Sequence, residues 1–342
     1  MIKAAILGAG FVAQLHALAY AQDPGVKLCA VCDANLPLAQ KLAQEQGMAA
    51  YEDAHALLEA EKPDVVSICL PSFLHEEYTV LALKAGAHVL CEKPLALTLD
   101  ACQRMAQAAK DAQRLLMAGQ VLRWWGEYQT IAAQLTGGGL GELMWLHAGR
   151  RQVGKRGGWL QDPQKSGGAL YDFHIHDVDY VLSLMGTDIR TVYAAGRQGE
   201  LGAWRQIDTL LTFEDGRVAH LEACNDLPEG SPFRAFLEAR CQNGTLRYHF
   251  ETAVNISADA KTLSTLQRRR GEEITDLPLA DDNAQQAAFQ REIHAFVAAV
   301  RSHSPAPLPI EETLRVMRCI ELIKRSLETG TAMTNARAFL YS

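Results

Sequence analysis

The chain of 342 residues lacks any hydrophobic run near the ~20 residues that a membrane-spanning helix requires. It also lacks an excess of positive charge. Its formal net charge is −7, which argues against the basic surface that nucleic-acid binding usually needs. No internal repeat or low-complexity segment interrupts an ordinary composition of 48% hydrophobic and 21% charged residues. These absences predict a soluble protein of about two domains, with neither a membrane nor a nucleic acid as its partner.

Cysteine is present, but it lacks the paired spacing of a zinc site. The eight cysteines lie mostly inside apolar runs, which is typical of reduced core thiols in a cytoplasmic protein. Cys29 and Cys32 have metal-like spacing, but they fall in a predicted strand, where they face opposite sides, and no second pair follows. We therefore predict no metal. The apolar start of the chain is broken by Gly8 and Gly10, so we expect no signal peptide and a cytoplasmic location.

Short apolar runs alternate with helical segments through the first part of the chain. The alternation indicates a parallel, doubly wound sheet of the α/β class, and we assign residues 1–120 to a dinucleotide-binding Rossmann domain. The predicted strands are 3–7, 26–32, 64–69, 87–91 and 115–118, and the predicted helices end near 21 or cover 36–46, 75–84 and 98–113.

The turn after the first strand carries the sequence Gly8-x-Gly10-x-x-Ala13. Glycines there permit a tight turn and close approach of the backbone to a pyrophosphate, and the following helix N-terminus supplies amide donors. Asp33 ends the second strand, ~20 residues beyond the motif, where an acid accepts hydrogen bonds from the ribose hydroxyls and repels a 2′-phosphate. The sequence therefore favours NAD over NADP as the cofactor.

In the second part of the chain the pattern of predicted elements changes, and strands dominate. Asp215-Gly216 and Asn243-Gly244 are hairpin signals, and we interpret the basic cluster Arg268–Arg270 as a solvated turn. We expect a second α+β domain over 121–342 with a large open antiparallel sheet, whose C-terminal helices can pack back on the first domain. The predicted strands are 142–149, 189–195, 206–213, 218–223, 233–240 and 245–250, and the predicted helices are 123–137, 166–185, 283–300 and 310–328.

Lys93 lies directly after an apolar strand that is expected to be buried, which is an unusual place for a lysine. The apolar strand 87–91 runs directly into Glu92-Lys93-Pro94, and lysine is rarely buried without a partner or a task. In open α/β sheets, ligands bind in the crevice at the carboxyl ends of the strands. Lys93 is therefore a candidate active-site ammonium.

A second polar cluster lies on the predicted helix 166–185. At ~100° per residue, Asp172, His176 and Asp179 fall within an arc of ~60° on one face, whereas His174 lies ~200° from Asp172. A histidine with a carboxylate four residues earlier can act as a general base. Two alternatives remain: a metal site formed by the pair His174 and His176, whose rings diverge on a helix, and a polar face that merely packs against the first domain.

The chain resembles the Gfo/Idh/MocA family, which includes glucose–fructose oxidoreductase and inositol dehydrogenase. The matching stretches are GAGFVAQLH, LPSFLHEEYTVLALKAGAHVLCEKPLALT and SGGALYDFHIHDVDYVLSLMG. The resemblance implies a Rossmann domain followed by a domain with an open sheet that often forms the oligomer interface. It also implies NAD-dependent hydride transfer to or from a sugar, inositol or related cyclic polyol. We accordingly expect a homo-dimer or homo-tetramer through the C-terminal sheet.

The resemblance also assigns roles to residues. It implies a catalytic group of Lys93, Asp172 and His176, and the chain departs from the common pattern at His174 and at Ser72. We expect the substrate to be bound by the catalytic three together with Arg123 and Trp159. The residues expected to bind the cofactor are Gly8, Gly10, Phe11, Val12, Asp33, Leu70, Pro71, Ser72, His75, Glu92 and Lys93.

Other functions remain open on the sequence alone. One is an NAD-using enzyme that cleaves glycosides through transient oxidation. Another is a non-catalytic NAD-binding sensor, against which the presence of all three catalytic residues argues. A third is reduction of a different kind of carbonyl compound.

Overall fold

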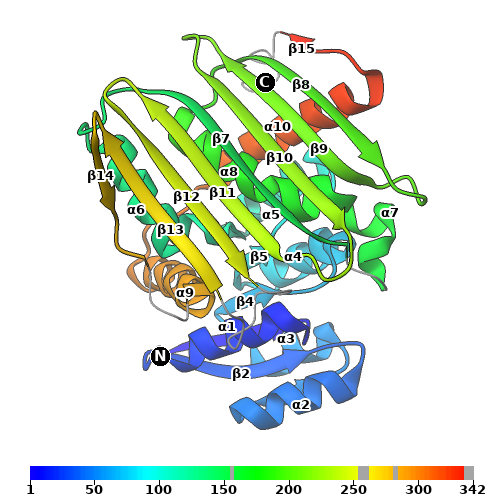
Figure 1. Ribbon diagram of the computed structural model, residues 1–342. Helices are drawn as coiled ribbons and strands as arrows, with labels where there is room; N and C mark the ends of the chain where they lie inside the picture. The colour runs from blue at the N-terminus through cyan, green and yellow to red at the C-terminus, as the bar shows by residue number, and fades with distance from the viewer. Residues whose placement is uncertain (155–157, 253–261, 280–283, 335–342) are drawn as a thin grey trace. The chain divides into compact units, whose positions relative to one another are not determined.

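The computed structural model describes residues 1–154, 158–252, 262–279 and 284–334 (Figure 1). Its contacts divide the chain into two compact units. The first comprises Met1–Trp124 and Gln285–Leu314, and the second comprises the described residues of Trp125–Ala284 and Arg315–Ser342. Across the described ranges, none of the helices combines enough length with enough apolar character to cross a membrane.

The first unit contains a parallel sheet of six strands in the order β3-β2-β1-β4-β5-β6. This is the doubly wound arrangement that the alternating pattern predicts, and its carboxyl edge is where ligands bind. Its strands are β1 (Ile2–Leu7), β2 (Val26–Cys32), β3 (Ala49–Tyr51), β4 (Val65–Ile68), β5 (His88–Glu92) and β6 (Leu116–Gly119). Its helices are α1 (Phe11–Ala21), α2 (Leu36–Gln46), α3 (Ala54–Glu61), α4 (His75–Lys84), α5 (Leu99–Ala112) and α9 (Ala284–Ser302), and the short 3₁₀-helices are η1 (Ser72–Leu74) and η2 (Val121–Trp124).

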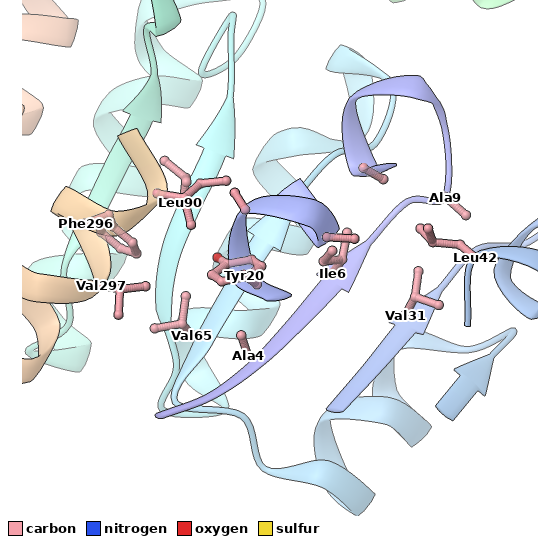
Figure 2. Close-up of a cluster of buried hydrophobic side chains, with 14 of the residues drawn as sticks. Ala4, Ile6, Ala9, Tyr20, Val31, Leu42, Val65, Leu90, Phe296 and Val297 are labelled. Atoms are coloured by element: carbon pink, nitrogen blue, oxygen red, sulfur yellow. The ribbon is translucent and has the colours of Figure 1, made fainter. Parts of the chain in front are cut away.

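A continuous apolar core explains why α9 belongs to this unit although it lies far along the chain. Phe296 and Val297 of α9 belong to the same buried cluster as Tyr20 of α1, Val65 of β4 and Leu90 of β5 (Figure 2). These side chains are hidden from solvent, so the helix contributes to hydrophobic stabilisation of the sheet. The predicted start of this helix at residue 283 lies outside the described residues.

The second unit contains a sheet of nine strands in the order β14-β13-β12-β11-β7-β10-β9-β8-β15. All its pairs are antiparallel except β7 with β10, which run parallel. The strands are β7 (Leu143–Val153), β8 (Ile189–Gln198), β9 (Trp204–Phe213), β10 (Val218–Leu227), β11 (Phe233–Cys241), β12 (Gly244–Thr252), β13 (Thr262–Arg270), β14 (Glu273–Asp276) and β15 (Met333–Thr334). The helical elements are α6 (Gly126–Thr136), η3 (Trp159–Gln161), α7 (Pro163–Ser166), η4 (Leu170–His174) and α8 (Ile175–Met185); α10 (Ile310–Thr329) begins in the first unit and continues into the second.

The sheet of the second unit has one buried face and one more exposed face. Along β7, Leu146, Ala148 and Arg150 are buried, while Trp145 and His147 on the other face are only half-buried; Gly149, which has no side chain, is the exception on that face. This period of two is what a sheet covered on one side requires. Helix α8 contacts β7 and β10, and Asp177 of α8 binds Arg150.

The prediction that Arg268–Arg270 form a turn is wrong, although Arg269 and Arg270 are exposed to solvent as predicted. The three arginines end strand β13, which pairs with both β12 and β14, and the turn begins at Gly271 with a φ of +58°. Arg268 donates hydrogen bonds to Gln134 and Thr275. A strand at the margin of a sheet tolerates charged side chains, which also discourage edge-to-edge association.

Candidate functional site

In the glycine turn between β1 and α1, the backbone lies close to neighbouring atoms on one side and is open on the other. Gly8 has a φ of +103°, and a Cβ there would lie 2.4 Å from the carbonyl oxygen of Cys69, so only glycine fits. Gly10 is the N-cap of α1, and a Cβ there would meet no atom within 4 Å. No side chain caps this helix and its first turn holds no acid. The turn therefore offers open space and amide donors, which fit a dinucleotide pyrophosphate.

Asp33 is tied directly to this turn. Its Oδ2 accepts a hydrogen bond of 2.8 Å from the backbone N–H of Ala9. Its Oδ1 accepts one of 2.8 Å from the backbone N–H of Asn35. An ionised carboxylate has about four acceptor positions, so two remain for the ribose hydroxyls. Asp33 can thus shape the turn and recognise the ribose with the same group.

Segments after β4 and β5 lie at the same carboxyl edge, and His75 joins them. The Nδ1 of His75 lies 2.7 Å from the carbonyl oxygen of Pro94, and its Nε2 lies 2.8 Å from that of Leu70. The ring is buried, and burial lowers the pKa of His75. His75 therefore lies between the segments that follow β4 and β5, and in its neutral form it donates to one of the two carbonyl oxygens. Its predicted direct contact with the cofactor stays a prediction.

Glu92, just before Lys93, belongs to a buried hydrogen-bonded chain that sequence reasoning missed. The distances are 2.7 Å from Tyr20 to Ser67, 2.9 Å from Ser67 to Nδ1 of His16, and 3.0 Å from Nε2 of His16 to Oε1 of Glu92. In one consistent arrangement, Tyr20 donates to Ser67 and Ser67 donates to Nδ1 of His16. The Nε2–H of His16 then donates to Glu92, so each donor is used once. These residues come from α1, β4 and β5, so only the fold brings them together.

The other carboxylate oxygen of Glu92 accepts from the backbone N–H of Lys93 at 3.2 Å. Glu92 thereby holds the backbone that carries the Lys93 side chain. Arg123, predicted to contact substrate, forms an ion pair of 2.6 Å with Glu312 inside the first unit. The substrate roles of Lys93 and Arg123 stay predictions, as does the cofactor role of Glu92.

In the second unit, Asp172 and His176 lie on either side of a change in helix type. Leu170–His174 form a π-helical turn that passes into α8. A π turn holds more residues than an α turn, so the uniform rotation per residue assumed from the sequence does not hold here. Such turns are frequent at functional sites. Asp172 and His176 are half-buried, while Asp179 is buried. Because Lys93 belongs to the first unit, the catalytic group of three stays a prediction.

His174 points into the core of the second unit. It is fully buried, and its Nε2 lies 3.0 Å from the hydroxyl of Thr209. Burial, together with the positive charge of Arg150 and His220, lowers the pKa of His174 to about 3. The side chain is therefore neutral at physiological pH and packs under β9. In the ranges that the structure describes, no group of three or more metal-binding side chains is found.

We expect the stability of the protein to fall as the pH is lowered from 7 to 5, partly through His174. An unfolded histidine titrates near pH ~6.5, so below that pH the unfolded state binds a proton that folded His174 does not. The cost is about 0.7 kcal/mol between pH 7 and 6, and it approaches about 1.4 kcal/mol per pH unit below pH 6. Urea unfolding at pH 7, 6 and 5 should show a shallower decline for His174→Gln. The exposed His55→Gln is the control, and equal slopes for both variants would contradict the expectation.

Sequence reasoning also missed three polar residues beside Asp172. A small cavity is lined by Asp172 and Ser166 together with Gln152, Arg205 and Asn225. The last three come from β7, β9 and β10, and no local motif marks them. Trp159, a predicted substrate contact, lies in η3 and is half-buried. Its role stays a prediction.

Comparison with known proteins shows what this architecture is similar to. A family profile described as "Oxidoreductase family, NAD-binding Rossmann fold" matches residues 2–120, and one described as "GFO/IDH/MocA C-terminal domain" matches residues 128–247. The chain is 30% identical over 356 residues to D-glucoside 3-dehydrogenase of Escherichia coli strain K12, with 96% of each protein covered. It is 25% identical over 347 residues to scyllo-inositol 2-dehydrogenase (NAD(+)) of Bacillus subtilis strain 168, covering 98% of this chain and 94% of that protein.

A solved structure shares the fold. The crystal structure of GenD2 from gentamicin A biosynthesis in complex with NAD superimposes with a TM-score of 0.84 at 21% identity, covering 97% of this chain and 96% of that one. Fold and profile together define an oxidoreductase with an NAD-binding Rossmann fold. More narrowly, the chain belongs to the Gfo/Idh/MocA family, as the resemblance implied.

Proposed function

We propose that this oxidoreductase transfers a hydride between NAD and a CH–OH or C=O carbon of a sugar, inositol or related cyclic polyol. The observation that carries the proposal is the open glycine turn, tied to Asp33, at the same sheet edge as Glu92 and Lys93. The D-glucoside and inositol dehydrogenases among its relatives support the substrate class.

Each catalytic residue has a role suited to its chemistry. Bound NAD supplies the hydride acceptor. His176 removes the proton from the substrate hydroxyl, and Asp172 orients the imidazole and stabilises its cation. Lys93 donates a hydrogen bond to the substrate oxygen, where negative charge develops as the hydride leaves. Glu92 accepts a hydrogen bond from the backbone N–H of Lys93, and His16 in turn bonds Glu92, which supports the position of the backbone at Lys93.

A dehydrogenase screen tests the proposal. Inositols, aldoses, anhydrosugars and glycosides are incubated with NAD and, in parallel, with NADP, while NADH or NADPH absorbance is followed. Net formation of NADH with a free polyol or sugar supports a dehydrogenase. Glycoside cleavage without net NADH would instead identify transient oxidation. Binding of NAD with neither reaction would identify a sensor.

We expect kcat/KM with NAD to exceed that with NADP by roughly ten-fold or more, because the Asp33 carboxylate repels a 2′-phosphate. Asp33→Asn keeps an acceptor for Ala9 but removes the charge, so the preference should shrink mainly through better use of NADP. Steady-state kinetics with both cofactors measures this. Asp53→Asn, which alters an exposed helix cap elsewhere in the unit, is the control. An unchanged ratio in Asp33→Asn would refute the role.

We also propose that the chain forms a homo-dimer or homo-tetramer through the more exposed face of its nine-stranded sheet. This face carries Trp145 and Phe236, which are half-buried, and Tyr193 and Leu210, which are 43% and 42% exposed. Exposed apolar and aromatic groups on one sheet face are typical of an interface. Light scattering of the purified chain tests this, and a monomer at micromolar concentration would contradict it.

A further inference from the structure

Four ring side chains gather on the more exposed face of the nine-stranded sheet. His147 of β7 lies opposite His220 of β10 in the strand register, and their rings stack with centres 4.4 Å apart and planes inclined by 10°. Phe236 of β11 meets the His147 ring edge-on at 4.9 Å, and the ring of Trp145 lies 5.9 Å from it. We call these four residues the histidine patch.

The stacked pair has little capacity for positive charge. Protonation of one imidazole disfavours protonation of the other, because the two rings are in contact. Nε2 of His147 is buried and has no hydrogen-bond partner within the described part of the chain. Nε2 of His220 lies 3.2 Å from Oδ1 of Asp208. Burial and the neighbouring His220 lower the pKa of His147, so a proton that enters the patch is held at His220.

The carboxylates nearest to the stack along the sheet are already bound to arginines. Glu238 of β11 lies opposite His147 in the register and accepts a hydrogen bond of 3.0 Å from Arg247. Glu222 of β10 accepts one of 2.8 Å from Arg151 of β7. Each of these carboxylates would have to give up an arginine to neutralise a new charge on the histidines. An added proton on the patch therefore depends on contact with water for much of its stabilisation.

The rim of the patch carries both signs of charge. Arg240 of β11 is exposed and lies opposite Trp145. His249 of β12 lies opposite Phe236, with its Nε2 3.9 Å from a carboxylate oxygen of Glu251. A partner with one strong charge finds no complementary surface here. A second copy of the chain does, because it brings the same rings and the same mixture of charges.

Apolar surface extends from the patch toward the edge of the sheet. Leu210 of β9 lies opposite His220, and Tyr193 of β8 lies opposite Leu210. Leu210 is 42% exposed and Tyr193 is 43% exposed. With the patch they form an apolar stripe that runs from β11 to β8. Exposed rings with a mixed polar rim are typical of contacts between identical chains, so the occupant that fits this surface is a second copy.

We propose that the histidine patch is the centre of a contact between copies of the chain, and that this contact weakens as the pH falls. A second copy that covers the patch removes water from both imidazoles. A neutral stacked pair tolerates this, whereas an imidazolium loses its hydration. Histidine titrates between pH 5 and 8, so separated copies take up protons that the assembly excludes. This inference rests on the proposed oligomer and states how it is regulated.

Sedimentation velocity over a concentration series of the full chain measures the dissociation constant of the assembly at pH 7.5, 6.5 and 5.5. We take the ordinary histidine pKa of ~6.5 and one excluded proton per protomer of a dimer. The dissociation constant should then rise by roughly 100-fold from pH 7.5 to pH 5.5. Circular dichroism confirms that the chain is folded at each pH.

The double variant His147→Gln with His220→Gln removes both titrating rings and keeps polar side chains in their place. Its dissociation constant should change by less than about three-fold over the same pH range. His249→Gln is the matched control, because it removes a histidine from the same sheet face but outside the stacked pair, and it should keep the full pH dependence. Dependence that persists in the double variant, or that His249→Gln alone abolishes, would refute the role of the stacked pair.

The oligomer and its pH dependence fail in different ways. A wild type that is monomeric at pH 7.5 would refute the oligomer and, with it, the contact at the patch. An oligomer whose dissociation constant stays the same or falls as the pH is lowered would refute the proton-dependent contact alone. Neither result bears on the proposed hydride transfer, which the dehydrogenase screen tests separately.

Discussion

Replacing His176 by alanine is expected to lower kcat by about 10²–10⁴-fold, the usual contribution of a general base. The affinity for NAD should change by less than about two-fold, because the proposed cofactor contacts come from other residues, which the change leaves intact. Steady-state kinetics with the best substrate from the screen gives kcat. A fluorescence titration with NADH gives the dissociation constant.

Two further measurements make the result specific. In the wild type, kcat should fall at low pH as the base becomes protonated, and this limb should disappear in His176→Ala. His55→Ala, which removes an exposed imidazole from α3, is the matched control and should leave kcat unchanged. If His176→Ala retains the wild-type rate, His176 is not the base, and the proposed role of Asp172 is lost with it.

The parts of the fold that could be predicted are those with a strong local signal. Strands β1, β4 and β5 are almost entirely buried, and each is followed by a turn and a helix. Such runs are recognisable without knowing their partners. Strand β3 has three residues and α3 has eight, too few for a clear period. Strand β13 ends in three arginines, whose charge hides its pairing.

The candidate site divides in the same way. Gly8, Gly10, Asp33 and Lys93 stand out because each sits at the end of a predicted strand. His16 could not be linked to Glu92 from the sequence, because 76 positions separate them and only the packing of α1 on the sheet brings them together. The grouping of Gln152, Arg205 and Asn225 depends on the register of three strands. Register is set by tertiary pairing, which a pattern of single residues does not contain.

Asp177→Ala is expected to cost about 3–5 kcal/mol of stability, because it leaves a buried guanidinium without its counter-ion. Asp177 is 1% exposed, and its two oxygens each lie 2.8 Å from a nitrogen of Arg150. Burial alone would lower the pKa of Arg150, but the charge and hydrogen bonds of Asp177 raise it above its ordinary value. Arg150 also lies 5.7 Å from the ring centre of Phe173, so the pair fixes the start of α8 on the sheet.

Thermal unfolding should show the loss as a decrease of roughly 6–20 °C in melting temperature. Glu214→Ala is the control: its pair with Arg190 is exposed, with 42% and 55% of the side chains accessible, and such pairs contribute at most about 1 kcal/mol. The double variant Arg150→Met with Asp177→Leu removes both charges and should recover most of the stability. If Asp177→Ala costs no more than the control, water reaches Arg150 and the pair does not hold α8. If the double variant is stable and Asp177→Ala is not, the ion pair serves to position the helix that carries His176. The kcat of the double variant should then fall although its melting temperature does not.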